Sequence, residues 1–143
     1  MRILVCGGRN FANPIPYKHS PENKKAMDEY KFVLNTLHDL SIEFSKEYNP
    51  NDNWLPTDIV IINGKAKGVD SASSDWAIVN YAQLKEYPAD WETHGKAAGF
   101  IRNQQMLDEG KPDLVIAFPG GSGTADMIRR AKKAGIEVRE VTY

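Results

Sequence analysis

The stretch that decides the fold is DLVIAFPGGSGT, residues 113–124. An apolar run at 113–118 passes directly into a glycine-rich loop at 119–124. A short, continuous apolar run that stops at glycines is typical of a buried parallel strand followed by a tight turn. We therefore expect a strand over the apolar run and a helix at 125–134 that Gly135 terminates.

The same succession of apolar run, glycine loop and helix recurs along the chain. ILVC at 3–6 runs into Gly7-Gly8, and DIVII at 58–62 runs into the loop GKAKG at 64–68. Weaker apolar runs predict two more strands. The expected strands are thus 3–6, 58–62, 83–87, 113–118 and 136–141, and the expected helices are 22–47, one that ends near residue 82, 94–109 and 125–134.

Strands that alternate with helices predict an α/β domain, because right-handed crossover connections place helices on both faces of a parallel sheet. We expect a Rossmann-like, doubly wound parallel sheet of about five strands. In the common strand order 3-2-1-4-5, the first and fourth strands are neighbours where the order reverses. The length of 143 residues fits one domain, 1–143, and three prolines within 11–23 predict an irregular loop after the first strand.

Charge and composition exclude several classes of function. Lys and Arg number 18 against 19 for Asp and Glu, so a net charge of −1 provides no basic field for long nucleic acid or an anionic membrane. The single cysteine cannot form an intramolecular disulfide, and the three scattered histidines lack zinc-ligand spacing, so we expect no metal. No signal-peptide core or membrane-spanning apolar stretch is evident, which favours a cytoplasmic protein.

The glycine loops are the strongest chemical signal. Ligands of such sheets bind beyond the carboxyl ends of the strands, where the loops at 7–9, 64–68 and 119–124 are expected to lie. A loop without side chains lets its N–H groups approach an anion at a helix N-terminus, and the hydroxyls of Ser122 and Thr124 add donors. The alternative is a tight turn in which Thr124 merely caps the helix.

These loops match neither of the two common nucleotide motifs. The Walker loop needs a terminal Gly-Lys-Ser/Thr, and the dinucleotide fingerprint needs GxGxxG after the first strand. ATP hydrolysis and ordinary NAD oxidoreduction are therefore disfavoured, and we expect no cofactor.

Several single residues near the loops are candidates for the site or for structural roles. Arg9 lies between two glycine loops and is suited to binding a phosphate. Asp70 either caps a helix or accepts from a ribose hydroxyl, and Arg102 is either a solvated surface charge or part of the site. Cys6 is expected to be a small buried hydrophobe, and Trp91 is expected to pack in the core or at a rim.

Five ordered motifs resemble the YspA-like branch of the SLOG superfamily, which is named for the Smf/DprA proteins and the Lonely Guy enzymes. They lie at 7–9, 64–70, 88–99, 102–107 and 117–124. The resemblance covers nearly the whole chain except 11–57, which we interpret as a segment that varies within the family. It implies a bacterial or phage protein with a Rossmann-like domain that binds a nucleotide or nucleotide-derived ligand and that pairs into a homodimer or higher homo-oligomer.

The resemblance also implies which residues hold the ligand. Arg9, Arg102 and the backbone of 120–124 would hold phosphate, and 64–70 would contact ribose or base. The expected ligand-binding residues are Gly7, Gly8, Arg9, Gly64, Lys65, Ala66, Gly68, Asp70, Lys96, Arg102, Asn103, Pro119, Gly120, Gly121, Ser122, Gly123 and Thr124.

Two alternatives to simple binding remain open. Lonely Guy enzymes hydrolyse the N-glycosidic bond of nucleoside monophosphates through Arg-Lys-x-x-Met and Pro-Gly-Gly-x-Gly-Thr-x-x-Glu motifs. Here Asn103 replaces the lysine, and Met127 replaces the glutamate whose carboxylate would stabilise an oxocarbenium-like state. A phosphoribohydrolase would use Arg102 with Asp126 or Asp70 as catalytic residues, and Met127→Glu would restore the missing carboxylate. The other alternative is a phage-type sponge that sequesters a nucleotide signal.

Overall fold

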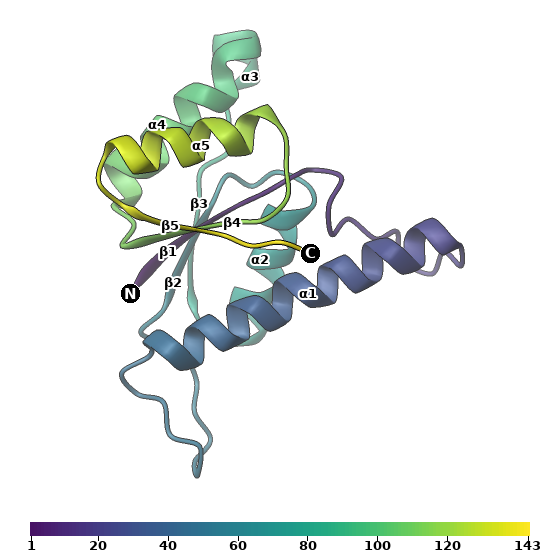
Figure 1. Cartoon of the computed structure of the whole chain (residues 1–143), viewed down its shortest axis with the longest axis vertical. Helices are drawn as coiled ribbons and strands as arrows, with labels where there is room; N and C mark the ends of the chain where they lie inside the picture. The colour runs from purple at the N-terminus through teal and green to yellow at the C-terminus, as the bar shows by residue number, and fades with distance from the viewer.

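The computed structural model describes residues 1–143 and contains one parallel sheet in the order β3-β2-β1-β4-β5 (Figure 1). Its strands are β1 (Arg2–Cys6), β2 (Val60–Asn63), β3 (Gln83–Glu86), β4 (Leu114–Ala117) and β5 (Glu137–Glu140). Leu4 in the central strand lies opposite Ile62 of β2 and Val115 of β4. The predicted five-stranded Rossmann-like sheet, with the first and fourth strands adjacent, is confirmed.

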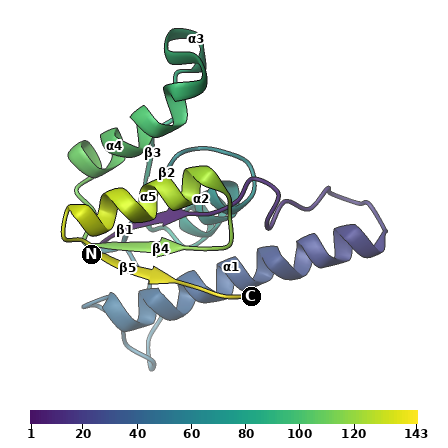
Figure 2. The same cartoon turned by 45° about the horizontal axis from the view of Figure 1, so that its top comes forward.

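Helices cover both faces of this sheet (Figure 2). They are α1 (Pro21–Phe44), α2 (Val69–Val79), α3 (Trp91–His94), a 3-10 turn (Gly95–Ala97), α4 (Ala98–Gly110) and α5 (Ser122–Lys133). Successive residues of a strand point to opposite faces, so Ile3 packs with α1 and α2 whereas Leu4 packs with α4 and α5. Two apolar layers therefore sandwich the sheet, and none of the helices combines the length and apolar composition that crossing a membrane requires.

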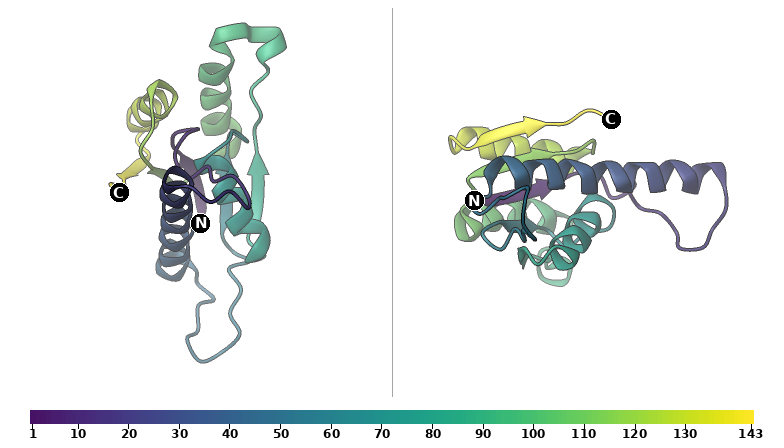
Figure 3. Two further views of the ribbon diagram at one scale, coloured as in Figure 1. Left: turned by 90° about the vertical axis from the view of Figure 1, so that its right-hand side faces the viewer. Right: turned by 90° about the horizontal axis from the view of Figure 1, so that it is seen from below.

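The helix expected at 94–109 is divided into α3, the 3-10 turn and α4. The Asp90 carboxylate accepts from the Thr93 N–H at 3.1 Å and starts α3 three residues before the expected helix. Gly95 then takes a positive φ of 56°, which ends α3 and turns the chain. As a result α3 stands off from the sheet at the end where the strands finish (Figure 3).

The segment 11–57 contributes α1 to the core and also extends beyond the sheet. Val33 and Leu37 of α1 are buried in the apolar layer on one face. At the other end, the Asn23 side chain accepts from the Ile15 N–H at 2.6 Å and donates to the Lys18 carbonyl at 2.7 Å. These bonds hold the proline-rich loop against the start of α1, which projects past the sheet in the right-hand view of Figure 3.

The last helix begins earlier than the sequence indicates. Ser122, Gly123 and Thr124 form the first turn of α5 rather than a loop, because Gly121 is the residue that caps the helix. No side chain makes a capping hydrogen bond at this end, so the alternative in which Thr124 merely caps the helix is wrong. The first N–H groups of α5 thus lack both intrahelical and side-chain acceptors.

Candidate ligand-binding site

A cleft of about 420 Å³ opens beyond the carboxyl ends of β1 and β4, between α5 and the segment from α3 to α4. Its size lies within the range of small-molecule sites. Twelve expected ligand-binding residues line it: Gly7, Gly8, Arg9, Ala66, Asp70, Lys96, Arg102, Asn103, Gly121, Ser122, Gly123 and Thr124. Gly68, Pro119 and Gly120 do not line it and instead lie at the contacts between the loops, and Gly64 and Lys65 line an adjacent cavity.

The first and last glycine loops touch at the floor of this cleft. Gly8 donates its N–H to the Pro119 carbonyl at 2.8 Å. A Cβ on Gly120 would collide with Thr124 Oγ1 and lie 2.8 Å from the Gly8 nitrogen, so this contact requires glycine. At Gly121, by contrast, a Cβ would meet nothing within 4 Å, so the N-terminus of α5 faces open space. An uncapped helix N-terminus in a cleft favours an anion.

Gly68 fixes the course of the middle loop. Its φ is +76°, and a Cβ there would lie 2.7 Å from the carbonyl oxygen of Arg9. A side chain would therefore be strained and would also push the first and middle loops apart. The close approach of these loops is what brings Arg9 and Ala66 to the same cleft.

Arg102 is half-buried and is not the solvated surface charge that its helical position allows. Its Nη1 donates to the carbonyls of Gly64 and, at 3.3 Å, Tyr87, and its Nε donates to Asn103 Oδ1 at 3.3 Å. Burial lowers the pKa of the guanidinium, while the nearby Asp70 carboxylate opposes that shift. The side chain thus connects α4 to the middle loop and still lines the cleft.

Gly64 is needed to leave room for this guanidinium, since a Cβ there would collide with the Arg102 side chain. We expect Gly64→Ala to displace Arg102 and to weaken binding of a nucleoside monophosphate by roughly tenfold. The matched control is Gly99→Ala in the same cleft, whose Cβ would make only an ordinary 3.5 Å contact with Trp91. Titration calorimetry of both variants checks this, and equal affinities would contradict it.

Asp70 is 7% exposed and is the only carboxylate that lines the cleft. Its Oδ2 accepts from the N–H groups of Gly64 at 3.1 Å and Ala66 at 3.2 Å, so it holds the middle loop in shape. It does not cap α2, whose N-cap is Gly68. Burial raises the pKa of Asp70 to about 6, although these hydrogen bonds and Arg102 act in the opposite direction.

The raised pKa of Asp70 makes the free energy of unfolding depend on pH. Because the folded pKa of Asp70 lies above its ordinary value of 3.8, the folded state holds this proton more tightly than the unfolded state. The stability contributed is complete only well below pH 3.8 and is lost as pH rises through about 6. Relative to Asp70→Asn, we expect the wild-type free energy of unfolding to fall by roughly 2 kcal/mol from pH 4 to 7. Denaturant titrations of both proteins measure it, and parallel pH curves would contradict the assignment.

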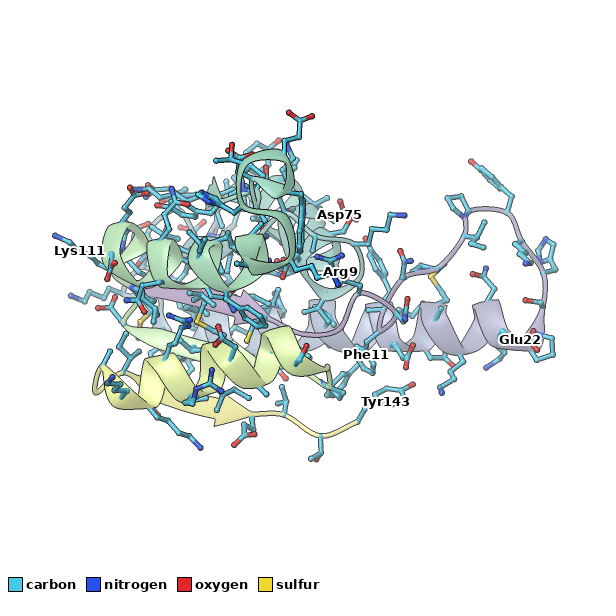
Figure 4. All side chains as sticks on the ribbon, turned by 90° about the horizontal axis from the view of Figure 1, so that it is seen from above. Arg9, Phe11, Glu22, Asp75, Lys111 and Tyr143 are labelled. Carbon is cyan, nitrogen blue, oxygen red and sulfur yellow. The ribbon has the colours of Figure 1, made fainter.

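Trp91 is a cleft residue that the sequence motifs did not single out as a ligand contact. The residue is 47% exposed, and the Arg9 guanidinium lies over its ring at 5.1 Å from the ring centroid. Figure 4 shows Arg9 beyond the end of β1, apart from the Phe11–Tyr143 contact at the C-terminus. The signal in the sequence was an aromatic residue inside the motif 88–99, where α3 begins.

Positive charge in and beside the cleft is not compensated by ion pairs. Five cationic residues line the cleft or the adjacent cavity, and none of them lies within 4.0 Å of a carboxylate. They are Arg9, Lys65, Lys67, Lys96 and Arg102. In a chain of net charge −1, this concentration of cations beside one carboxylate gives the cleft a local positive charge that is favourable for an anion.

Asp126, the expected catalytic partner of Arg102, does not line the cleft. It is 2% exposed and accepts from Asn103 Nδ2 at 3.0 Å and from Arg130 Nε at 2.8 Å, with Arg129 on its other oxygen. The bond from Asn103 ties α4 to α5, whereas Arg129 and Arg130 belong to α5 itself. Asn103 also donates to the Gly123 carbonyl at 3.1 Å, so its amide positions the first turn of α5.

Met127 is fully buried in the apolar layer with Leu4 and Met106. A carboxylate at this position would enter the core rather than the cleft. Cys6 is buried as expected, and burial raises the pKa of its thiol to about 12. The thiol is therefore protonated and is not a nucleophile at neutral pH.

Comparisons with known proteins agree with this fold. The chain is 39% identical over 93 residues to the Gene 61 protein of Mycobacterium phage D29, a match that covers 58% of this chain and 71% of the phage protein. Its fold is similar to the X-ray structure of TM1055, a structural genomics target, with a TM-score of 0.57 and 16% identity over 96% of this chain and 71% of that one. No protein-family model matches the chain.

Proposed function

We propose that this chain, which belongs to the family of the Gene 61 protein of Mycobacterium phage D29, binds a nucleotide or nucleotide-derived ligand in the cleft. One observation carries the proposal: unpaired cations line the same cleft as the uncapped N-terminus of α5, with Asp70 as the only carboxylate among them. Bringing like charges together is unfavourable unless an anion offsets the repulsion. A phosphate group fits both the cations and the free N–H groups.

The phosphate would lie at Gly121–Thr124, where the helix N-terminus supplies N–H donors and Ser122 supplies a hydroxyl. Arg9 and Arg102 line the same cleft. The ribose or base would then lie toward Ala66 and Trp91, and the exposed indole ring provides an apolar face for it. The resemblance to the YspA-like branch of the SLOG superfamily supports a nucleotide as the source of the phosphate.

Hydrolysis of the N-glycosidic bond is a second candidate function, favoured by the raised pKa of Asp70 beside Arg102. A carboxyl group with a pKa near neutrality can donate or accept a proton at physiological pH. In this account Asp70 and Arg102 are the acting residues, and Asp126 is a structural residue. The phage relative favours a third version, in which the protein sequesters a nucleotide signal without turnover.

The proposal is tested by titrating the protein with nucleoside monophosphates, NAD, ADP-ribose and cyclic nucleotides, and by chromatography of each mixture for released base. We expect stoichiometric binding of at least one ligand of this panel. Released base that disappears in Asp70→Asn would establish the hydrolase instead. Absence of binding across the panel would contradict the proposal.

We further propose that the protein binds its ligand in the host cytoplasm, where small nucleotides are dissolved. The resemblance to the SLOG superfamily favours a homo-oligomer. Few phosphates of a duplex could be neutralised by a chain of net charge −1, so binding to long DNA or RNA should be weak at physiological salt. A steeply salt-dependent duplex complex would favour a nucleic-acid-binding function.

A further inference from the structure

A second cavity of about 490 Å³ adjoins the cleft on the side of the middle glycine loop. The two share Arg9, Ala66, Trp91 and Arg102, which therefore form the wall between them. Each cavity alone is in the size range of a small-molecule site. A ligand larger than one nucleotide could occupy both.

The second cavity is lined by four cationic residues and by no acidic residue. Lys65 and Lys67 belong to it alone, whereas Arg9 and Arg102 face both cavities. None of the four lies in an ion pair. Such a cluster repels itself in the absence of a ligand and favours a second anionic group.

The loop that carries the two lysines is held in a fixed shape. The Lys65 N–H donates to Asn63 Oδ1 at 2.9 Å, and Lys65 itself has a positive φ of 54°. The buried Asn63 side chain donates in turn to Ser73 and Ser74 at 2.8 Å, and Asp70 holds the next residue of the loop at the Ala66 N–H. An unfavourable backbone conformation maintained by buried hydrogen bonds is a feature of ligand sites.

We propose that the ligand carries two phosphate groups, one at the N-terminus of α5 and a second between Lys65, Lys67 and Arg9, as in a dinucleotide. This inference rests on the proposed function, which requires only the first phosphate. Arg9 lies on the shared wall, so its guanidinium can donate toward both phosphates. Trp91 on the same wall provides a face against which a base can stack.

Three adenine probes separate the number of phosphates from the number of bases. AMP has one phosphate and one base, the dinucleoside monophosphate ApA has one phosphate and two bases, and the 5′-phosphorylated dinucleotide pApA has two of each. Calorimetric titration should show pApA binding at least about tenfold more tightly than either AMP or ApA.

The variant Lys65→Gln/Lys67→Gln removes two positive charges and keeps side chains of similar length. We expect it to weaken pApA binding by about tenfold or more and to change AMP binding by less than about threefold. The control is Lys31→Gln/Lys133→Gln, which removes the same charge at two exposed lysines outside both cavities. It should leave all three affinities unchanged.

The outcomes distinguish this inference from the function on which it rests. If AMP binds and pApA is no tighter, or if the lysine variant affects AMP and pApA equally, the second phosphate site is wrong and the proposed function stands. If none of the three probes binds, neither the inference nor nucleotide binding in this cleft survives for adenine ligands.

Discussion

Gly121→Asp is expected to bind a nucleoside monophosphate more than tenfold more weakly than the wild-type protein, a loss above about 1.4 kcal/mol. The substitution places a carboxylate at the N-cap of α5, where the phosphate is proposed to lie. An aspartate there accepts from the free N–H groups of the helix and repels the ligand. Calorimetric titration of the two proteins measures the change.

The same substitution should leave the fold intact, which makes the affinity change interpretable. A Cβ at Gly121 meets nothing within 4 Å, and aspartate is a favourable N-cap residue. Gly121→Asn is the matched control, since it has the same size and capping ability without the charge. If Gly121→Asp folds and binds as tightly as Gly121→Asn, no phosphate lies at this helix end.

Met127→Glu is expected to destabilise the protein by ~3 kcal/mol or more and to create no hydrolase activity. Met127 is 0% exposed and packs among apolar side chains, so a glutamate would be buried without a partner. Met127→Leu, which conserves volume, should cost less than about 1.5 kcal/mol. Denaturant titration gives both values, and a stable Met127→Glu that releases base would overturn this placement.

The position of Met127 could not be inferred correctly from the sequence motif. The motif comparison aligned it with a catalytic glutamate, and the expected helix began at Ala125, which placed the residue in the first turn beside the glycine loop. In the structure α5 begins at Ser122, and position 127 lies in the second turn, facing the sheet. The residue lies in the core because it is on the face of α5 that packs against the sheet, and a motif match does not reveal that face.

The sheet, in contrast, was predictable because its signals are local. An apolar run of four to six residues that ends in glycines predicts both a strand and the turn that follows it. Parallel strands joined by right-handed crossovers can then be arranged in only a few orders. The loops of Gly7, Gly64 and Gly121 therefore had to meet at one edge, and they do.

Side-chain roles depended on contacts between distant segments and were less predictable. Arg102 reaches the carbonyl of Gly64, 38 residues away, and Asp126 is bound by Asn103, 23 residues away. Neither partner can be identified from spacing along the chain. The Arg9–Trp91 contact likewise depends on α3, which starts at Trp91, three residues before the helix expected from the sequence.

The most direct test of the central claim is a ¹H–¹⁵N NMR titration of the protein with AMP. We expect the largest shifts of backbone amides at Ser122, Gly123 and Thr124 in the first turn of α5, with the N-cap Gly121 next, because these N–H groups border the proposed phosphate. Shifts confined to other surfaces, or no shifts at millimolar AMP, would contradict it.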